Sequence, residues 1–564
     1  MMFTPLDLLP DALNASFKAI PAVMVSGMLL LFLGIGYVFR VADTEDLWVA
    51  GRSIGNVENG MAIGANWMSA ASYLGMAALI ALSGYYGLAF VIGWSTGYFI
   101  LLIFLAAQMR RFGKYTAPDF VGDRFDSDTA RAIAALTTIL IGFVYSVGQA
   151  RGMGLVGIYV FGGDYATMVV LLMAITVGYL ALSGMLGATK NMAVQYVILI
   201  VAFLAGLYAV GFTQGYSTVL PQIEYGALLS QLNSEFTEPF STGGFYLWVA
   251  TAFSLIVGTC GLPHVLVRFY TVESERTARW STVWGLFFIC LLYLSAPAFA
   301  AFGTDLYAKQ VGDVYGASGM SGAEGDVIVV LASQLANLPT WFVGLVAAGG
   351  IAAAIATTAG LFIAASSAAA HDIYTNIINS DATQRQQLLI GRVTIVVLGA
   401  IVTVTALDPP ALVGELVALA FSLAGLVLFP MFFLGLWWEN ANRQGALAGM
   451  TTGLVIWTAA VFNELVFATE AGPVVPAYAE VFPAVGAALA GTPIVFAVTI
   501  GVSLATDEPP ERIKRIVRQC HSPEPMGQQQ SAEDVVSTDG VPASEESRGS
   551  SDLASDGGRV SGDD

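Results

Sequence analysis

The sequence predicts an all-α polytopic membrane protein, and three observations carry this prediction. The first is composition, because 56% of the 564 residues are hydrophobic, only 11% are charged, and the mean hydropathy is +0.71. A soluble domain of this length would carry far more charge. The second is that the apolar residues form runs of about 20 residues, the length that a helix needs to cross a bilayer. The third is the one-sided distribution of Lys and Arg between these runs.

We predict about thirteen membrane-spanning helices from these runs. Their approximate bounds are 19–39, 60–82, 88–109, 132–160, 165–184, 191–213, 244–267, 280–302, 339–370, 389–407, 411–437, 445–464 and 480–504. The first run follows a polar outer segment, 1–18, and no small-residue cleavage site follows it, which argues against a removable signal peptide.

The charges between the runs agree with this number of helices when the N-terminus is placed outside. Each predicted inner loop then contains Lys or Arg, whereas the predicted outer side has only Lys18 and Lys309. Cytoplasmic loops of membrane proteins carry such an excess of positive charge. We therefore expect a multi-pass protein of the cell membrane with its N-terminus outside and its C-terminus in the cytoplasm.

Residues 509–564 are expected to form a cytoplasmic tail that is first basic and then acidic and disordered. From Ser522 onward it consists largely of Ser, Gly, Asp and Glu, which cannot bury enough apolar surface to fold. The three cysteines and three histidines are scattered, so their spacing predicts neither a disulfide nor a metal cluster. His371 and Asp372 are adjacent, but they end a predicted helix, and a role at that helix end is the favoured interpretation.

The segment 60–82 is unusual because its centre, GANWMSAASYLG (Gly64–Gly75), brings small and polar groups to bilayer depth. Unwound backbone is tolerated there only where it lines a cavity or is buried in protein. Broken helices of this kind mark ion and substrate sites in secondary transporters, because freed carbonyls can coordinate a cation. A continuous helix that packs closely on a neighbour through small residues is an equally good interpretation of this stretch alone.

Five stretches, in this order along the chain, resemble the sodium:solute symporters, and among them the acetate and short-monocarboxylate permeases. They are WVAGRSIGNVENGMAIGANWMSAASYLG (Trp48–Gly75), RRFGKYTAPDFVGDRF (Arg110–Phe125), SGMLGATKNMAVQ (Ser183–Gln195), GTCGLPHVLVRFYTV (Gly258–Val272) and SSAAAHDIYTNI (Ser366–Ile377). The resemblance covers about 46–457 and is more specific to the family than to the substrate.

The resemblance implies a leucine-transporter-like fold of two inverted five-helix repeats, each with a discontinuous first helix. In this chain the repeats would be 60–213 and 244–437, with 19–39 as an extra leading helix and 445–504 as two trailing helices. The first helix of each repeat has a Gly-rich centre, GANWMS in one and GTCGLP in the other. This pairing favours two broken helices that face each other at the midplane.

The resemblance also implies a sodium site where the first broken helix meets the eighth core helix, 339–370. The aligned positions are Ala65, Met68, Ala353, Ala356 and Thr357, with Thr358 as a neighbouring hydroxyl that could replace the one missing at Ala356. Sodium is a hard cation and prefers several oxygen ligands. Without the resemblance, each threonine would be expected to donate to a carbonyl one turn earlier in its own helix.

The resemblance places the expected substrate contacts around the two breaks. They are Asn66, Trp67, Ser69, Ser72 and Tyr73 on the first helix, and Thr259, Cys260 and Gly261 on the opposite one. An indole at Trp67 would make a small, dry pocket that suits a solute with an apolar end, although an aromatic that only fills space is equally compatible. Small residues at 259–261 argue against a sugar, because the sugar-transporting relatives have bulky aromatic residues there.

Arg151 lies far from both ends of the predicted helix 132–160. A charge at that depth costs at least about 2.5–3.5 kcal/mol on insertion scales, so it needs a partner or a water-filled cavity. A substrate carboxylate would be such a partner, and a structural pair with an acidic residue or with helix-end carbonyls is the other interpretation. Tyr145 and Gln149 lie on nearby turns and are expected to line the same cavity.

We therefore expect a sodium-coupled secondary active symporter that imports a small organic anion, acetate or a related short monocarboxylate, by alternating access. Its partners would be that anion, sodium as the coupling ion and the lipid bilayer, with no other cofactor or metal and no nucleic acid. A sodium symporter for another small solute, such as the amino acid proline, a transporter-fold membrane sensor and a passive channel are the alternatives. An enzyme is not expected, since no nucleophile, base and metal set converges.

Overall fold

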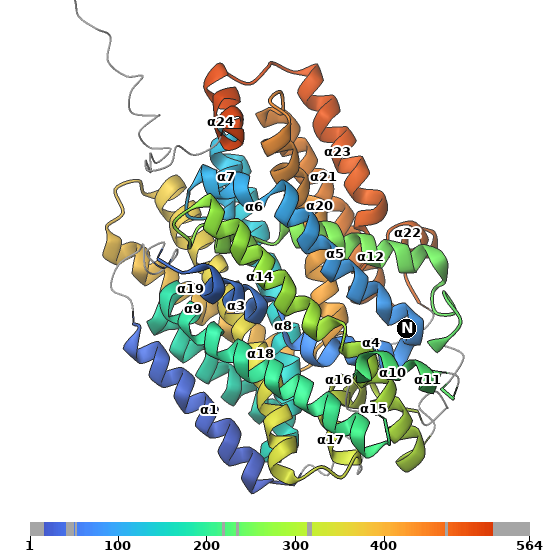
Figure 1. Cartoon of the computed structure of the whole chain (residues 1–564). Helices are drawn as coiled ribbons and strands as arrows, with labels where there is room; N and C mark the ends of the chain where they lie inside the picture. The colour runs from blue at the N-terminus through green and yellow to red at the C-terminus, as the bar shows by residue number, and fades with distance from the viewer. Residues whose placement is uncertain are drawn as a thin grey trace, which may run out of the picture. The chain divides into compact units, whose positions relative to one another are not determined.

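The computed structural model describes residues 16–40, 50, 53–216, 220–229, 231–232, 236–312, 319–468 and 472–522. The regular elements in these residues are all helices (Figure 1). Residues 1–15 and 523–564, which contain most of the predicted outer segment and the acidic part of the predicted tail, lie outside the described residues.

The first helices of the chain correspond closely to the predicted runs. They are α1 (Ala19–Val38), α3 (Asn56–Trp67), η3 (Ala71–Gly75), α4 (Met76–Ser83), η4 (Gly84–Gly87), α5 (Leu88–Phe104), α6 (Ala106–Phe112), α7 (Ala117–Arg124), α8 (Asp128–Phe161) and α9 (Tyr165–Thr213).

The remaining elements begin with two short helices and include α18 and α20, which belong to the two most completely buried candidate spans. They are α10 (Pro221–Glu224), α11 (Gly226–Leu229), α12 (Gly244–Gly261), α13 (Pro263–Leu266), η6 (Val267–Phe269), α14 (Glu275–Tyr293), α15 (Ala296–Gln310), α16 (Gly322–Asp326), α17 (Ile328–Leu335), α18 (Thr340–Ser367), η7 (Ala368–Ile378), α19 (Gln384–Ala406), α20 (Val413–Trp437), α21 (Arg443–Val461), η8 (Phe462–Val466), α22 (Pro476–Val481), α23 (Ala488–Ala505) and α24 (Glu511–His521).

In the described residues, eleven helical stretches are long and apolar enough to cross a membrane. This confirms the prediction of an all-helical membrane protein, whereas the number of about thirteen is not confirmed. One reason is that the second half of the predicted helix 60–82 and the predicted helix 88–109 fall in one apolar stretch, Ala71–Phe104. Another is that the predicted helix 165–184 is observed as a shorter apolar helix, Tyr165–Ala181. In α9 the predicted helices 165–184 and 191–213 meet at a kink at Gly184, where the backbone leaves the helical region, and the predicted loop 185–190 is helical.

The centre of the protein is built around α18, whose apolar stretch is buried throughout. It packs against α8, α9 and α3, and α20 packs against α8 and α12. The middle of α18 reads AAGGIAAAIATTAG (Ala347–Gly360), and small side chains of this kind let neighbouring helices approach closely. The two helices that carry the predicted breaks, α3 and α12, therefore lie against a continuous helical core.

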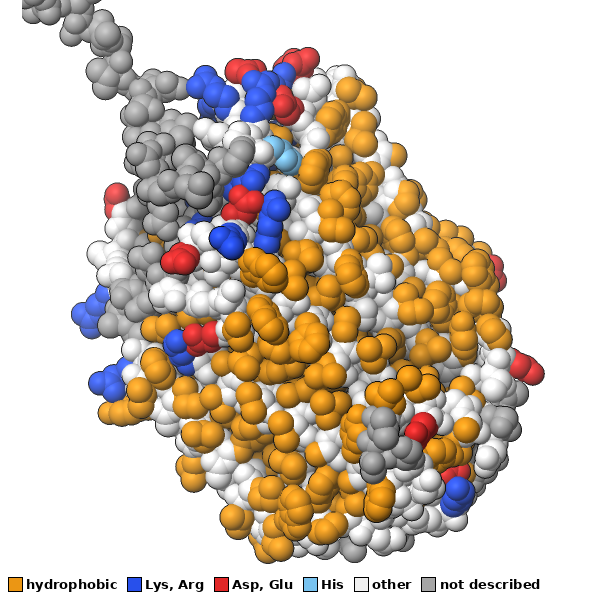
Figure 2. All heavy atoms as spheres, viewed as in Figure 1, with side chains coloured by type: hydrophobic (Ala, Val, Ile, Leu, Met, Phe, Trp, Pro, Cys, Tyr) orange, Lys and Arg blue, Asp and Glu red, His pale blue; other side chains and the backbone are white. Residues whose placement is uncertain are grey.

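The outer surface of the helices is apolar over a broad area, and charged side chains gather toward the end that carries α24 (Figure 2). Large apolar side chains are exposed on several different helices, for example Leu30, Ile103, Phe287, Val397 and Val455. Such an extended apolar surface is expected of helices that face lipid.

The basic beginning of the predicted tail forms a helix that the sequence analysis did not predict. In α24, Ile513, Val517 and Cys520 are buried against α6, α7 and α20. Arg518 donates hydrogen bonds to Glu439, which follows α20, and to Glu511 of its own helix. A short amphipathic helix thus covers the end of the bundle to which the charged loops belong.

The kink in α9 gives a prediction about stability. Gly184 has φ 55° and ψ −160°, a conformation that L residues with a side chain rarely adopt. We expect Gly184→Ala to lower the free energy of unfolding by about 1–3 kcal/mol, seen as earlier thermal unfolding of the purified protein in detergent. Gly178→Ala in the same helix is the control, because a Cβ there meets no atom of the described residues within 4 Å. Equal unfolding temperatures for the two variants would contradict this account.

Candidate functional site

The break in the first predicted helix lies at Met68 and Ser69, between α3 and η3. Met68 has φ −74° and ψ 72°, outside the helical region. The Ser69 amide donates to the Trp67 carbonyl at 2.8 Å, and the Ser72 amide donates to the Ser69 carbonyl at 3.0 Å. These two amides would otherwise close α-helical turns on the carbonyls of Ala65 and Met68. The break therefore frees the two carbonyl oxygens that the sequence analysis assigned to a sodium site.

Side chains from other helices hold the break in this conformation. The Oε1 atom of Gln149 in α8 accepts from the Ala70 amide at 2.8 Å. The hydroxyl of Thr357 in α18 donates to the Asn66 carbonyl at 2.8 Å. Backbone groups at bilayer depth must find partners within the protein, and here α8 and α18 supply them.

The two threonines of α18 have different partners. The Thr357 hydroxyl reaches across to α3, as above, whereas the Thr358 hydroxyl donates to the Ala354 carbonyl at 2.8 Å, one turn earlier in its own helix. Both side chains are buried, as are Ala353 and Ala356. The structure thus directs Thr357 toward the break and gives Thr358 the ordinary bond of a threonine within a membrane helix.

A second break separates α12 from α13. Leu262 is extended, with φ −76° and ψ 117°, and Pro263 begins α13. Gly261 lies so close to the Ala424 carbonyl of α20 that a Cβ there would overlap it. The Thr259 hydroxyl donates to the Leu255 carbonyl at 2.7 Å, and the Cys260 sulfur lies 3.6 Å from the Gly97 carbonyl of α5. Small residues at 259–261 therefore permit close packing of α12 on α5 and α20.

The two breaks meet at Asn66. Its Nδ2 atom donates to the carbonyl of His264 in α13 at 3.1 Å. Its Oδ1 atom lies against Gly360 of α18, where a Cβ would overlap it. Asn66 thus joins α3, α13 and α18. This contact agrees with the prediction that the segments 60–82 and 244–267 face each other.

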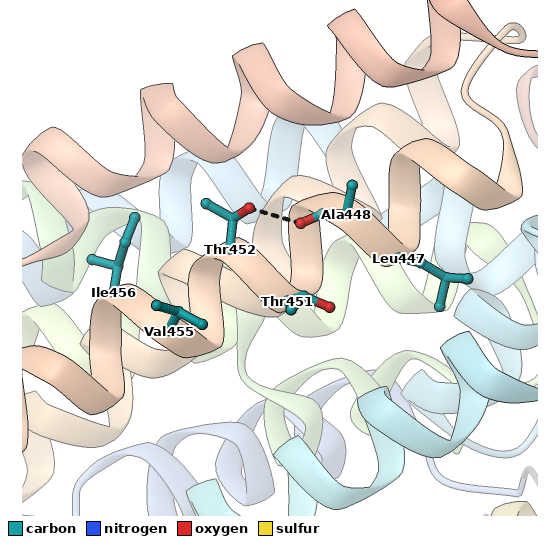
Figure 3. A pocket seen from close by; sticks show the side chains of 6 residues that line it. All are labelled: Leu447, Ala448, Thr451, Thr452, Val455 and Ile456. Atoms are coloured by element: carbon teal, nitrogen blue, oxygen red, sulfur yellow. Dashed lines mark hydrogen bonds between the residues drawn. The ribbon is translucent and has the colours of Figure 1, made fainter.

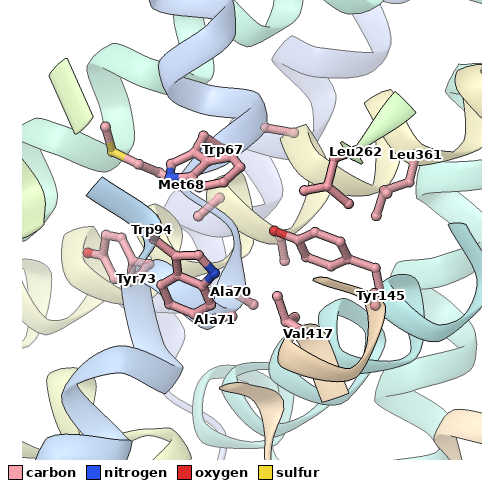
Figure 4. Close-up of a cluster of buried hydrophobic side chains, with 14 of the residues drawn as sticks. Trp67, Met68, Ala70, Ala71, Tyr73, Trp94, Tyr145, Leu262, Leu361 and Val417 are labelled. Atoms are coloured by element: carbon pink, nitrogen blue, oxygen red, sulfur yellow. The ribbon is translucent and has the colours of Figure 1, made fainter. Parts of the chain in front are cut away.

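Aromatic side chains surround the break (Figure 4). Trp67 packs edge-on against Tyr98 at 4.5 Å between ring centroids, and Phe421 of α20 contacts Trp67, Trp94 and Tyr145 at 5.4, 5.7 and 5.8 Å. In Figure 4 the rings of Trp67, Trp94 and Tyr145 come together from α3, α5 and α8. Sequence reasoning missed Trp94 and Phe421, because an aromatic residue inside an apolar run carries no signal of its own.

Three more of the predicted contacts serve to position the segment after the break. The Ser69 hydroxyl accepts from the Ala71 amide at 3.1 Å. The Ser72 hydroxyl is hydrogen bonded to the Tyr293 hydroxyl of α14 at 2.8 Å. The Tyr73 hydroxyl donates to the Val346 carbonyl of α18 at 2.9 Å. These bonds tie η3 to two helices of the surrounding bundle.

Three hydrogen-bond donors near the break are buried without an acceptor among the described residues, and one of them is the indole Nε1 atom of Trp67. The other two are the Nε2 atom of Gln149, whose Oε1 atom is already bonded to Ala70, and the indole Nε1 atom of Trp94. Each group can only donate. A group that only accepts hydrogen bonds, such as a carboxylate, is the kind of partner that such donors lack.

Arg151 is placed away from these donors, in an ion pair. Its Nε atom lies 2.6 Å from Oδ2 of Asp326 in α16, and both side chains are buried. Asp326 also accepts from the Val413 amide at the start of α20, at 3.3 Å. Of the two interpretations offered by the sequence, this pairing favours the structural one, in which Arg151 connects α8 to α16 and α20.

His371 and Asp372 belong to a polar cluster where η7 meets α7. The ligand atoms of Asp119, His371 and Asp372 lie within 4.8 Å of one another. However, the Asp119 carboxylate already faces His371 Nε2 at 3.1 Å and Arg131 Nη1 at 3.2 Å. Burial would raise the pKa of Asp119, but His371 and the neighbouring cations outweigh it and lower the pKa to about 2. We therefore interpret the cluster as an ion-pair network that fastens the end of α18 to α7.

A shallow hollow on the face of α21 is unrelated to the break (Figure 3). It is lined only by residues of that helix, namely Leu447, Ala448, Thr451, Thr452, Val455 and Ile456. The Thr452 hydroxyl donates back to the Ala448 carbonyl, as the dashed line shows. Its apolar lining and its position on one trailing helix are those of a lipid-facing surface.

Comparison with known proteins gives consistent results. A family model described as "Sodium:solute symporter family" matches residues 47–453. The chain is 29% identical to an uncharacterized symporter of Cupriavidus necator, over 86% of this chain and 91% of that one. It is 32% identical to the uncharacterized symporter YwcA of Bacillus subtilis, over 74% of this chain and 80% of that one.

Among solved structures, the chain is similar in fold to a Na⁺-coupled sialic acid symporter in a substrate-bound, outward-open state. The TM-score is 0.70 at 15% identity, and the match covers 87% of this chain and 99% of that one. At this identity the likeness concerns the fold alone.

The Arg151–Asp326 pair gives a prediction that separates its two interpretations. We expect Asp326→Asn to lower the free energy of unfolding by about 3–5 kcal/mol, because it leaves a buried guanidinium without its counter-ion. The double variant Arg151→Met with Asp326→Asn should regain much of this loss, as measured by thermal unfolding in detergent. If Arg151 instead binds the solute, the double variant will be stable but will show a much weaker apparent affinity for the solute in uptake assays.

Proposed function

Because the chain belongs to the sodium:solute symporter family, we propose that it couples the entry of sodium ions to the import of a small organic anion, acetate or a related short monocarboxylate. Its family and fold are those of transporters. The observation that carries the anion assignment is the pair of buried donors, Gln149 Nε2 and Trp94 Nε1, beside the helix break.

The proposed sodium site consists of the freed carbonyls of Ala65 and Met68 in α3 together with the Thr357 hydroxyl and the carbonyl of Ala353 in α18. Its support is the diversion of the Ser69 and Ser72 amides, which leaves the two carbonyls of α3 available. A hard cation with several oxygen ligands fits this set of neutral donors. The 2.8 Å bond from Thr357 to Asn66 supports the choice of Thr357 over Thr358.

In the proposed substrate site, one end of the anion accepts hydrogen bonds from Gln149 and Trp94, and its apolar end contacts the rings of Trp67 and Tyr145. Tyr145 and Trp67 are almost fully buried, so the site is dry. A charge-assisted hydrogen bond is strong under such conditions. A short aliphatic chain would contact these aromatic rings without needing polar partners.

Gln149 would couple the two ligands. Its Oε1 atom holds the Ala70 amide and so helps to keep the break open, while its Nε2 atom would donate to the anion. Sodium and substrate then each favour the arrangement that the other needs, which is the condition for coupling, and this linkage acts equally in both directions.

A symporter for an amino acid is the second candidate, and one observation favours it. The Oδ1 atom of Asn66 is a buried acceptor without a donor among the described residues. An ammonium group would satisfy it while the carboxylate of the same solute bonded to Gln149. Competition of unlabelled proline against labelled acetate distinguishes the two candidates.

Sodium coupling through Thr357 is tested by uptake of labelled acetate into proteoliposomes with an inward sodium gradient. We expect Thr357→Ala to raise the half-saturating sodium concentration about tenfold, which corresponds to the loss of an interaction worth about 1.4 kcal/mol. Thr358→Ala is the matched control, because its hydroxyl bonds only within its own helix. A larger effect of the Thr358 variant would move the site, and sodium-independent uptake would refute the coupling.

The role of Trp94 as a donor is tested with Trp94→Phe, which keeps an aromatic ring and removes the N–H group. We expect the half-saturating acetate concentration to rise about 10- to 100-fold, the usual worth of a hydrogen bond to a charged group. Trp457→Phe is the control, because that indole already donates to the Leu419 carbonyl at 3.0 Å. Unchanged acetate affinity in the Trp94 variant would contradict the proposed site.

A further inference from the structure

Arg268 is a buried cation in η6, just after the second helix break. It follows the predicted helix 244–267 directly and so belongs to the predicted inner loop before 280–302, but only 1% of its surface is exposed. Its Nη1 atom donates to the Thr189 hydroxyl of α9 at 2.8 Å, and its Nη2 atom contacts the sulfur of Met192. Its Nε atom has no acceptor among the described residues. The guanidinium group is thus surrounded by neutral atoms.

The other buried arginines of the described chain have carbonyl or carboxylate acceptors. Arg124 donates to the carbonyls of Gly435, Trp438 and Ala441. Arg110 donates to those of Val272 and Glu273. Arg131 pairs with Asp119 and Asp123, and Arg151 pairs with Asp326. Within the described residues, Arg268 differs from all of them, because its partners are a hydroxyl and a thioether.

This difference matters because a guanidinium group stays charged under all ordinary conditions. Burying a charge is costly unless it is paired. A thioether is a weak acceptor and a threonine hydroxyl carries no charge. Among the residues that the structure describes, no negative charge balances Arg268, and a small anion would provide it.

Further polar groups in the region of Arg268 make no hydrogen bond of normal geometry within the described chain. Gln195 lies two turns along α9 from Thr189, and neither atom of its side-chain amide is hydrogen bonded within the described chain. The Tyr179 hydroxyl lies beside Gln195 and close enough to Arg268 for an electrostatic interaction, without a hydrogen bond of normal geometry. Gln195 and Tyr179 could both donate to an anion held by Arg268.

His264 connects this region to the first break. It lies one turn before Arg268, and neither of its ring nitrogens has a partner among the described residues. Its ring packs edge-on against Tyr145, with 5.5 Å between the centroids, and its carbonyl accepts from Asn66. A series of buried polar groups thus leads from the proposed substrate site past His264 to Arg268.

We propose that Arg268, with Gln195 and Tyr179, forms a second anion site that receives the carboxylate of the transported solute after it leaves the break. This inference rests on the proposed function for the identity of the anion. The chemistry that recognises it is that of a small monovalent anion, which chloride shares. The experiment below therefore separates acetate from chloride.

The sharpest variant introduces a carboxylate within the protein itself. Met192→Glu places an acid beside the Arg268 guanidinium and would occupy the site permanently, while Met192→Gln has the same size and no charge. Arg268→Gln removes the cation. Arg124→Gln is the matched control for the loss of a buried arginine, because that side chain is already satisfied by carbonyls.

The measurement is thermal unfolding of the full chain in detergent, with potassium methanesulfonate as the background salt and potassium acetate or potassium chloride added. We expect acetate to raise the unfolding temperature of the wild type and of Arg124→Gln without sodium. Arg268→Gln and Met192→Glu should lose this shift. In proteoliposomes, acetate uptake by Met192→Glu should be about 10- to 100-fold slower than by Met192→Gln, the effect of losing a hydrogen bond to a charged group.

Three results would overturn the inference. The first is an acetate-dependent rise in unfolding temperature that persists in Arg268→Gln. The second is acetate transport by Met192→Glu that is as fast as transport by Met192→Gln. The third is a rise in unfolding temperature with chloride and none with acetate, which would mean that the site binds chloride and not the carboxylate. If instead the wild type takes up no monocarboxylate in a sodium gradient, the proposed function fails, whatever the variants show about Arg268.

Discussion

The rest of this structure depends on one constraint, the need to satisfy the backbone of α3 where it is broken inside the membrane. Gln149 binds the Ala70 amide and Thr357 binds the Asn66 carbonyl, so α8 and α18 must both lie within reach of the break. Glycines make this approach possible, because a Cβ at Gly152 would meet the Ala70 side chain at 2.8 Å and one at Gly360 would overlap Asn66. The same contacts that satisfy the backbone groups at the break also bring together the oxygen atoms and hydrogen-bond donors of the proposed sites.

Much of the fold could be predicted from sequence because the bilayer imposes simple rules on length and polarity. The runs of apolar residues begin and end close to the observed helices, and the unusual centre at Gly64–Gly75 corresponds to an actual break. What the sequence could not reveal was that the predicted loop 185–190 is helical, so that the two predicted helices of α9 are separated by the kink at Gly184 alone. It also could not reveal that α24 packs on the bundle, because a short basic segment is equally compatible with a solvated tail.

The candidate site was harder to predict, because its residues act through partners that are distant in sequence. Thr357 and Thr358 are adjacent and chemically identical, and only the contact with Asn66, 291 residues away, distinguishes them. Gln149 was expected to line a cavity. Its Oε1 atom also accepts a hydrogen bond from the Ala70 amide and so stabilises the break, a role that no pattern in the sequence indicates. Trp94 gave no signal, since an unpartnered indole is a property of its surroundings rather than of its neighbours in the chain.

The arginines show why the depth of a charge and its role are separate questions. Arg151 drew attention because it lies deep in a predicted helix, yet its partner Asp326, 175 residues away, neutralises it. Arg268 was not singled out, because it follows a predicted helix and could be assumed to reach water. Among the described residues, however, its side-chain partners are neutral atoms. A buried charge that is already paired has little attraction left for a ligand, whereas an unpaired one retains most of it. Of the two, Arg268 therefore has the stronger physical reason to meet an anion that crosses the membrane.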